Sequence, residues 1–146
     1  MLKRIFRMGV RMFLLPAAFV LGCEHSPPVQ PAGFALQPDL SSIQTNIFDR
    51  KCAIEGCHIG SGAPPIGNGM DLARGKTFGN TVNIPSAERP TLFRIEPGNA
   101  DSSYLVLKIE GAPGIVGQQM PFGRSPLSQD EIDVIRQWID GGAQIN

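Results

Sequence analysis

An all-α domain, in which short helices are joined by long loops, is the fold that this sequence predicts. Apolar residues recur at helical spacing near both ends of the segment 40–146. Glycine and proline supply 17 and 13 of the 146 residues, about a fifth of the chain against an average nearer 12%. The helices must therefore be separated by a large proportion of turn and loop.

Composition narrows the class of protein. The 13 basic and 13 acidic residues cancel, so the chain has no excess positive charge for nucleic acid. A charged fraction of 18% is too low for a disordered acidic or basic protein. Eight Phe, one Trp and one Tyr are few aromatic residues for a small core, so we expect another group to fill part of its centre.

Residues 1–22 have the pattern of a secretory signal peptide. Four basic residues, the last of them Arg11, precede an apolar run over 12–21 that is too short to cross a bilayer easily. The run ends in the sequence VLGC, which resembles the bacterial lipoprotein cleavage box and predicts lipidation of Cys23. Ordinary secretory cleavage and an uncleaved anchor are the alternatives, since Leu21 is bulkier than the residue usual at its place.

Cleavage would change the charge of the chain. Residues 1–22 contain four of the 13 basic residues and none of the 13 acidic ones, so the remainder would carry a net charge of −4. Residues 23–39 then form a proline-rich tether, and residues 40–146 form one folded domain. Acyl chains on Cys23 would hold the protein stably on a membrane. Glu24, rather than Asp, follows the cysteine; by the sorting rule of enteric bacteria this favours the outer membrane, with the domain facing the periplasm.

The first element expected in the domain is a helix that ends at Cys52. Asp39 and Ser41 are both suitable N-caps for it. Its apolar residues recur at helical spacing: Ile43, Ile47 and Phe48.

The middle of the domain has weaker signals. Residues 59–91 contain most of the glycine and proline loop signals and are predicted to be irregular. Residues 104–109 form either a short helix or a buried strand. Ser102 or Ser103 is a suitable N-cap for a helix there, and the turn at residues 97–99 slightly favours that choice.

The last helix has the clearest signals. Ser128 and Glu131 have the spacing of a capping box, in which each side chain bonds the other's backbone amide. Gly141 and Gly142 follow as a stop signal. The apolar residues between them lie on one stripe: Ile132, Ile135, Trp138 and Ile139.

The chemistry of the chain is concentrated in Cys52 and Cys57, which His58 follows directly. Covalent haem attachment requires two thiols that reach the two vinyl groups of the porphyrin, and an imidazole that reaches the iron from the same peptide. A cysteine pair that ends in Cys-His meets this requirement. The usual spacing has two residues between the cysteines, whereas here there are four, so the loop must bulge, and Gly56 is a natural place for the extra turn.

Three other interpretations of the cysteine pair remain open. In an oxidising compartment Cys52 and Cys57 could form a disulfide, with His58 incidental. A structural zinc site would need a fourth ligand, and only His25, in the tether, is available. A thioredoxin-like redox pair would need a two-residue gap and an alternation of strands and helices that the sequence lacks.

Together these motifs resemble the small class I-like monohaem cytochrome c domains of bacteria, including lipoprotein variants with relaxed cysteine spacing. The resemblance covers residues 40–146. Its parts occur in order: a helix leading into the Cys-His motif, GMDL at 69–72, PG at 97–98, SYL at 103–105, Met120-Pro121 and the closing helix. It implies a cytochrome c-like fold, in which the N- and C-terminal helices pack beside one covalent haem c. The packing residues would be Ile47 and Phe48 with Ile135, Trp138 or Ile139.

The resemblance also implies that Met120, in the sequence MPFG, is the second axial ligand of the haem iron, opposite His58. Pro121 restricts Met120 to an extended backbone and donates no amide of its own. Met70 matches a core position of the family. An open or water-bound iron and ligation by His25 are the alternatives.

These residues predict a one-electron carrier rather than an enzyme, although the domain could serve an oxidoreductase complex. With His58 and Met120 both bound, the iron would stay hexacoordinate, and the neutral thioether would favour ferrous iron. The expected partners are redox proteins and, through the lipid, a membrane; we expect a monomer that does not bind nucleic acid. The alternatives are a haem enzyme or gas sensor with an open sixth site, and a haem-free envelope lipoprotein with a Cys52–Cys57 disulfide.

Three basic residues border segments expected near the haem and are candidates for pairing with its propionates: Arg94, Lys108 and Arg124. A solvated charge is the simpler alternative for each of them.

Overall fold

The computed structural model describes residues 35–60 and 67–146, and within these ranges the regular secondary structure is helical and is joined by long loops, as the sequence predicts. In chain order the helical elements are α1 (Leu40–Ile43), η1 (Gln44–Cys52), η2 (Gly67–Gly69), α2 (Thr77–Thr81), α3 (Tyr104–Glu110) and α4 (Gln129–Asp140). Within the described ranges, extended pairing consists of two isolated bridges, Val82 with Ile95 and Pro85 with Phe93. The predicted signal peptide, Cys23 and most of the predicted tether lie outside the described residues.

The predicted first helix is present and ends at the predicted residue. Asp39 is its N-cap, because the carboxylate accepts a 2.7 Å hydrogen bond from the Ser42 amide. α1 continues directly into η1, whose turns are wider than those of an α-helix: the Ala53 amide donates to the carbonyl of Phe48, five residues back, at 2.7 Å. Side chains four or five residues apart therefore share a face. The buried apolar residues of the helix have this spacing: Ile43, Ile47 and Phe48.

The predicted capping box of the last helix is also present. The Glu131 amide donates to Ser128 Oγ at 3.3 Å, and the Ser128 amide donates to the Glu131 carboxylate at 2.8 Å. Gly141 is the C-cap, and Gly142 follows with a φ of +98°. The predicted apolar stripe is buried along its whole length: Ile132, Ile135, Trp138 and Ile139.

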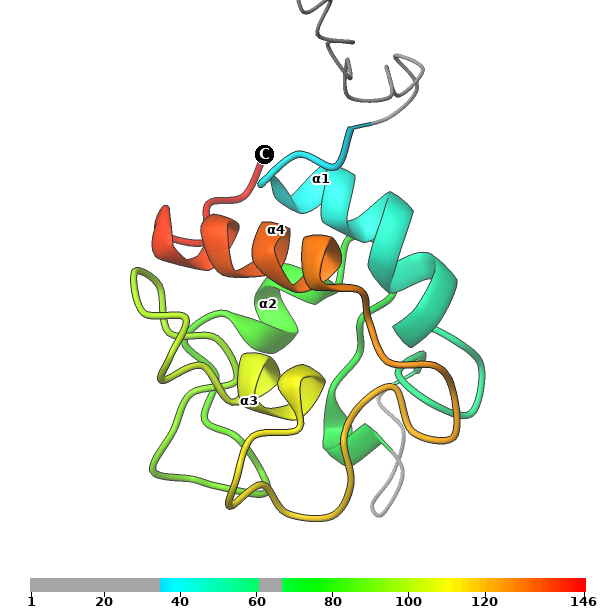
Figure 1. Cartoon of the computed structure of the whole chain (residues 1–146), viewed down its shortest axis with the longest axis vertical. Helices are drawn as coiled ribbons and strands as arrows, with labels where there is room; N and C mark the ends of the chain where they lie inside the picture. The colour runs from blue at the N-terminus through cyan, green and yellow to red at the C-terminus, as the bar shows by residue number, and fades with distance from the viewer. Residues whose placement is uncertain (1–34, 61–66) are drawn as a thin grey trace, which may run out of the picture. The chain divides into compact units, whose positions relative to one another are not determined.

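α4 lies at the centre of the helical packing. Figure 1 shows it (orange) crossing α1 (cyan) on one side and approaching α3 (yellow) on the other, and both pairs of helices are in contact. One cluster of buried apolar residues joins them. It includes the residues expected from the first and last helices: Ile47, Phe48, Ile135, Trp138 and Ile139.

The segment 104–109, which the sequence left between helix and strand, is helical and forms α3. Ser103, one of the two predicted residues, is its N-cap, although the Ser103 side chain makes no capping hydrogen bond. Its hydroxyl donates to the Asn99 carbonyl and accepts from the Glu96 amide, both at 2.9 Å, so it closes the turn that precedes the helix. Gly111 ends α3 in the left-handed conformation, with φ +67°.

The segment 59–91, predicted to be irregular, contains the short helix α2. Its sequence, TFGNT, has no apolar periodicity, and hydrogen bonds from other parts of the fold hold it in place. The single hydroxyl hydrogen of buried Thr77 is shared between the Gln44 side-chain oxygen, at 2.5 Å, and the Leu72 carbonyl, at 3.0 Å. α2 thus depends on tertiary contacts rather than on local propensity.

The Glu131→Gln substitution is expected to lower the free energy of unfolding at pH 7 by about 1 kcal/mol. It removes an ion pair with Lys51, at 2.6 Å, and weakens the capping box. Burial opposes ionisation of Glu131, but bonds from Lys51 and Ser128 outweigh it and lower the pKa of this carboxyl below the ordinary value of 4.5. The contribution is therefore present above pH 4.5 and is lost as the pH falls through the lowered folded-state pKa.

Urea unfolding of the wild type and the variant at pH 7 and at about pH 3 checks this expectation. The stability difference should shrink at the acidic pH, because the wild-type contribution is lost as Glu131 begins to take up a proton. Lys51→Met is the matched control: it removes the ion pair alone and should cost less than Glu131→Gln. A difference of the same size at both pH values would contradict the assignment.

Candidate functional site

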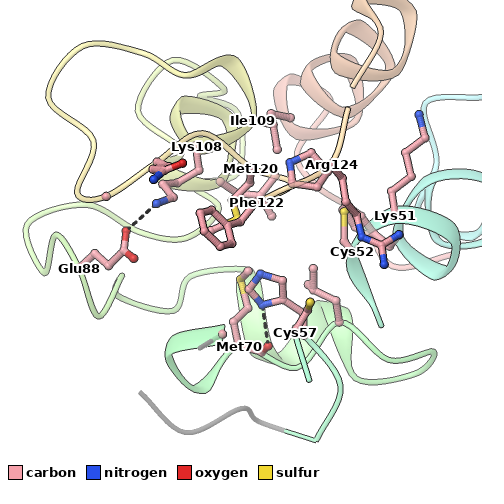
Figure 2. A pocket seen from close by; sticks show the side chains of 18 of the residues that line it. Lys51, Cys52, Cys57, Met70, Glu88, Lys108, Ile109, Met120, Phe122 and Arg124 are labelled. Carbon is pink, nitrogen blue, oxygen red and sulfur yellow. Dashed lines mark hydrogen bonds and ion pairs between the residues drawn. The ribbon is translucent and has the colours of Figure 1, made fainter. Parts of the chain in front are cut away.

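A cavity of about 460 Å³ opens in the described part of the domain, within the range of about 300–1,000 Å³ typical of ligand and cofactor sites. Its wall is mostly apolar. The wall comes from five parts of the chain: the end of η1, the residues from Cys57 to Leu72 that the structure describes, the loop residue Glu88, α3, and the loop 116–124. Figure 2 shows the side chains that converge on it.

Cys52 and Cys57 both lie on the wall of this cavity, as free thiols. The Ile54 amide donates to the Cys52 carbonyl, and the Cys57 amide donates to the Ile54 carbonyl, each at 2.9 Å; these bonds shape the loop between the cysteines. Gly56 has a φ of +80°, so the predicted extra turn is present at this glycine. Figure 2 shows both cysteine side chains at the same end of the cavity.

The Cys52 thiol is protonated at physiological pH. Burial, reinforced by the negative charge of Glu131, raises the pKa of Cys52 to about 12. A thiol with this pKa is a poor nucleophile and a poor thiolate ligand. This observation counts against a reactive thioredoxin-like pair.

His58 lies half-buried on the same wall and is oriented by a backbone carbonyl. Its Nδ1 is 3.2 Å from the Met70 carbonyl oxygen, the dashed line beside Met70 in Figure 2. Burial is the main cause that lowers the pKa of His58, so the neutral imidazole is favoured. In the neutral tautomer that donates Nδ1–H to this carbonyl, Nε2 keeps its lone pair for a metal ion.

Met120 and Met70 line the same cavity as the cysteines and the histidine. The Met120 amide donates to the Lys108 carbonyl in α3 at 2.9 Å, which fixes the backbone at this point of the loop. The fold therefore brings the predicted iron ligands and thioether cysteines to one cavity. His25, the alternative ligand, lies outside the described residues.

The three candidate propionate partners differ in their surroundings. Arg94 donates to the carbonyls of Asn68, Gly69 and Asn80, at 2.8–3.3 Å, and lines a second cavity of about 90 Å³ rather than the main one. Lys108 and Arg124 both line the main cavity, but Lys108 is buried and ion-paired whereas Arg124 is exposed. Arg94 thus holds the turn that precedes Met70, a role that spacing in the sequence does not reveal.

Sequence reasoning missed two residues of the wall. Glu88 lines both cavities and pairs with Lys108; nothing in its local sequence marks it. Phe122 is 63% exposed on the wall of the main cavity, and its place directly after Met120-Pro121 is the signal that could have identified it.

The described residues lack two further features. They contain no group of three or more His, Cys, Asp or Glu side chains arranged to hold a metal ion. In the same residues, no helix is long and apolar enough to span a membrane.

Comparison with known proteins gives no assignment: no family model, no curated protein and no solved structure matches this chain.

Proposed function

We propose that this chain is an extracytoplasmic, membrane-tethered c-type cytochrome that carries single electrons through one covalently bound haem. One observation carries the proposal: Cys52, Cys57, His58 and Met120 line one apolar cavity. These residues come from two segments more than 60 positions apart, and they are the side chains that the Cys-x4-Cys-His motif and the Met-Pro loop had suggested.

The cavity fits haem in volume and in chemistry. Its volume of about 460 Å³ lies within the cofactor range, and its wall is mostly apolar, as a porphyrin face requires. Cys52 and Cys57 would hold the group through two thioethers. His58 and Met120 would supply the imidazole and the thioether that bind its iron.

The residues around the cavity suit an electron carrier. When bound, the haem would supply a one-electron ferric–ferrous couple. The Met70 carbonyl keeps the His58 ring in one tautomer and orientation, which supports a fixed ligand. A neutral thioether from Met120 would favour the ferrous state, and an iron held by both His58 and Met120 would have no position left for oxygen or peroxide.

The helical packing supports a cytochrome c-like arrangement. α4 contacts the first helix, and their buried residues belong to one core cluster. Phe48 belongs to that cluster and also lines the cavity. The proposed cofactor would therefore lie beside the packed first and last helices, where it completes the core.

The proposed location is inferred from the segments on either side of the proposed signal cleavage site. Lipid on Cys23, followed by the tether of residues 23–39, would keep the domain at the periplasmic face of the cell envelope, with the outer membrane favoured. The proposed partners are redox proteins that approach the haem edge, and the protein acts as a monomer.

Expression with a cytochrome c maturation system tests this function. We expect a red protein that is reduced and reoxidised reversibly by one electron and whose ferrous form does not bind carbon monoxide. Rapid binding of carbon monoxide would instead favour the haem enzyme or gas sensor. A colourless, fully folded product would contradict the proposal and favour the haem-free lipoprotein.

A further inference from the structure

A buried polar cluster lies beside the cavity, at the end away from the two cysteines (Figure 2). Lys108 is 8% exposed, and its Nζ lies 3.2 Å from Glu88 Oε2. Tyr104, 5% exposed, donates its hydroxyl hydrogen to the same oxygen at 2.7 Å. Asn68 donates to the other Glu88 oxygen at 2.6 Å. Both oxygens of the half-buried Glu88 carboxylate therefore have partners.

The contribution of this cluster to stability does not explain its presence. Removing two charges from water is costly, and well-packed apolar residues in the same place are often as stabilising as a buried ion pair. Such a cluster instead fixes the groups that it bonds in one arrangement.

The cluster bonds the loop that carries Met120. Lys108 Nζ donates to the Val116 carbonyl at 2.7 Å, and the Val116 amide donates to Tyr104 Oη at 2.9 Å. At the other end of this segment, the Met120 amide donates to the Lys108 carbonyl, and the Gln119 side chain donates to the Ile109 carbonyl at 2.7 Å. The segment 116–120 is thus fastened to α3 at both ends.

Building on the proposed function, we propose that Lys108, Tyr104 and Glu88 are positioning residues that hold the segment 116–120 so that the Met120 thioether stays at the sixth coordination position. Glu88 fixes the Lys108 ammonium and the Tyr104 hydroxyl. These two groups in turn fix the backbone carbonyl and the backbone amide of Val116. Loss of either contact lets the segment move away and exposes the position to other ligands.

The test compares three variants of the haem-loaded protein. Lys108→Met removes the bond to the Val116 carbonyl, and Tyr104→Phe removes one hydroxyl only. Glu110→Gln is the matched control: it lies in α3 but pairs with Arg136 in α4, at 2.9 Å, and does not line the cavity. The readouts are the sulfur-to-iron charge-transfer band of the ferric protein and the affinity for added imidazole.

We expect Lys108→Met and Tyr104→Phe to keep their covalent haem, to lose intensity in the charge-transfer band and to bind imidazole about tenfold more tightly. Glu110→Gln should match the wild type in both readouts. If the first two variants keep the wild-type band and the wild-type imidazole affinity, the positioning role is wrong, while the cytochrome proposal stands.

Haem staining of the same samples after denaturing electrophoresis distinguishes failure of the positioning role from failure of the proposed cytochrome function. A wild-type protein without covalent haem would overturn the proposed function, and the positioning role with it. Lys108→Met could fail to fold because it leaves Glu88 without its cation. In that case the charge-transfer band and the imidazole affinity of Tyr104→Phe test the positioning role. This variant leaves the Lys108–Glu88 pair intact, so wild-type readouts from it would overturn the positioning role.

Discussion

Replacing both Cys52 and Cys57 by serine is expected to yield a chain without covalent haem and without a stable native fold. The reason is the size of the cavity that the proposed cofactor would fill. Without the cofactor, the mostly apolar wall of a cavity of about 460 Å³ would be left unfilled and exposed to water. The net stability of a small domain is only about 5–15 kcal/mol. Exposure of this wall is therefore expected to remove a large part of the stability of the domain.

Far-UV circular dichroism and urea unfolding measure this effect. The double variant should have reduced helical signal and no cooperative transition. Cys23→Ser is the matched control, because it removes the third cysteine and the proposed lipid but leaves the cavity intact; it should remain red and cooperative. A double variant that unfolds cooperatively with wild-type stability would show that the cysteines do not link a core-forming group.

Replacing Met120 by alanine is expected to change the haem spectrum and to lower the reduction potential while covalent haem is retained. The sulfur-to-iron charge-transfer band should disappear, since the thioether is its source. Loss of a neutral ligand that favours ferrous iron should lower the potential by an amount on the order of 0.1 V, within the span of about 0.8 V that axial ligands control. Absorption spectroscopy and a redox titration measure both.

Met70→Leu is the control for this substitution. Met70 lines the same cavity, and its carbonyl, which accepts the His58 bond, belongs to the backbone and is retained. The substitution conserves volume and should leave the band and the potential close to those of the wild type. Unchanged spectra in Met120→Ala would contradict ligation by Met120 and favour an open iron, as in an enzyme or sensor.

The parts of the fold that the sequence predicted are those with local signals. Asp39 and Ser128 begin their helices through bonds to amides three residues ahead, and such bonds depend only on neighbouring residues. The apolar residues before Cys52 and along α4 similarly recur at helical spacing, because each helix buries one face. α3 was ambiguous because six mostly apolar residues fit a buried strand as well as a helix.

The parts that the sequence did not predict depend on distant contacts. α2 is short, contains a glycine and is held through Thr77 by Gln44, 33 positions away. Arg94 bonds carbonyls 14 to 26 positions earlier, and no spacing rule marks carbonyl acceptors. The same holds for Glu88 and Lys108, whose pairing requires the loop and α3 to be packed already.

The candidate site also has a part that the sequence predicted from local signals and a part that depends on distant contacts. Cys52, Cys57 and His58 lie within seven consecutive positions, so the sequence identified them as a motif. Met120 is more than 60 positions from His58, and only the resemblance to cytochrome c domains suggested it. Its place on the cavity wall depends on the Lys108 carbonyl and on the packing of α3, which no local pattern encodes.

The central claim is that haem is linked to both cysteines of the Cys-His motif, and peptide mass mapping tests it most directly. The protein, matured with a cytochrome c assembly system, is digested, and the mass of the peptide that contains Cys52 to His58 is measured. We predict that this peptide carries the mass of one haem and that neither thiol can be alkylated. A peptide of unmodified mass, with its two cysteines free or joined as a disulfide, would contradict the account.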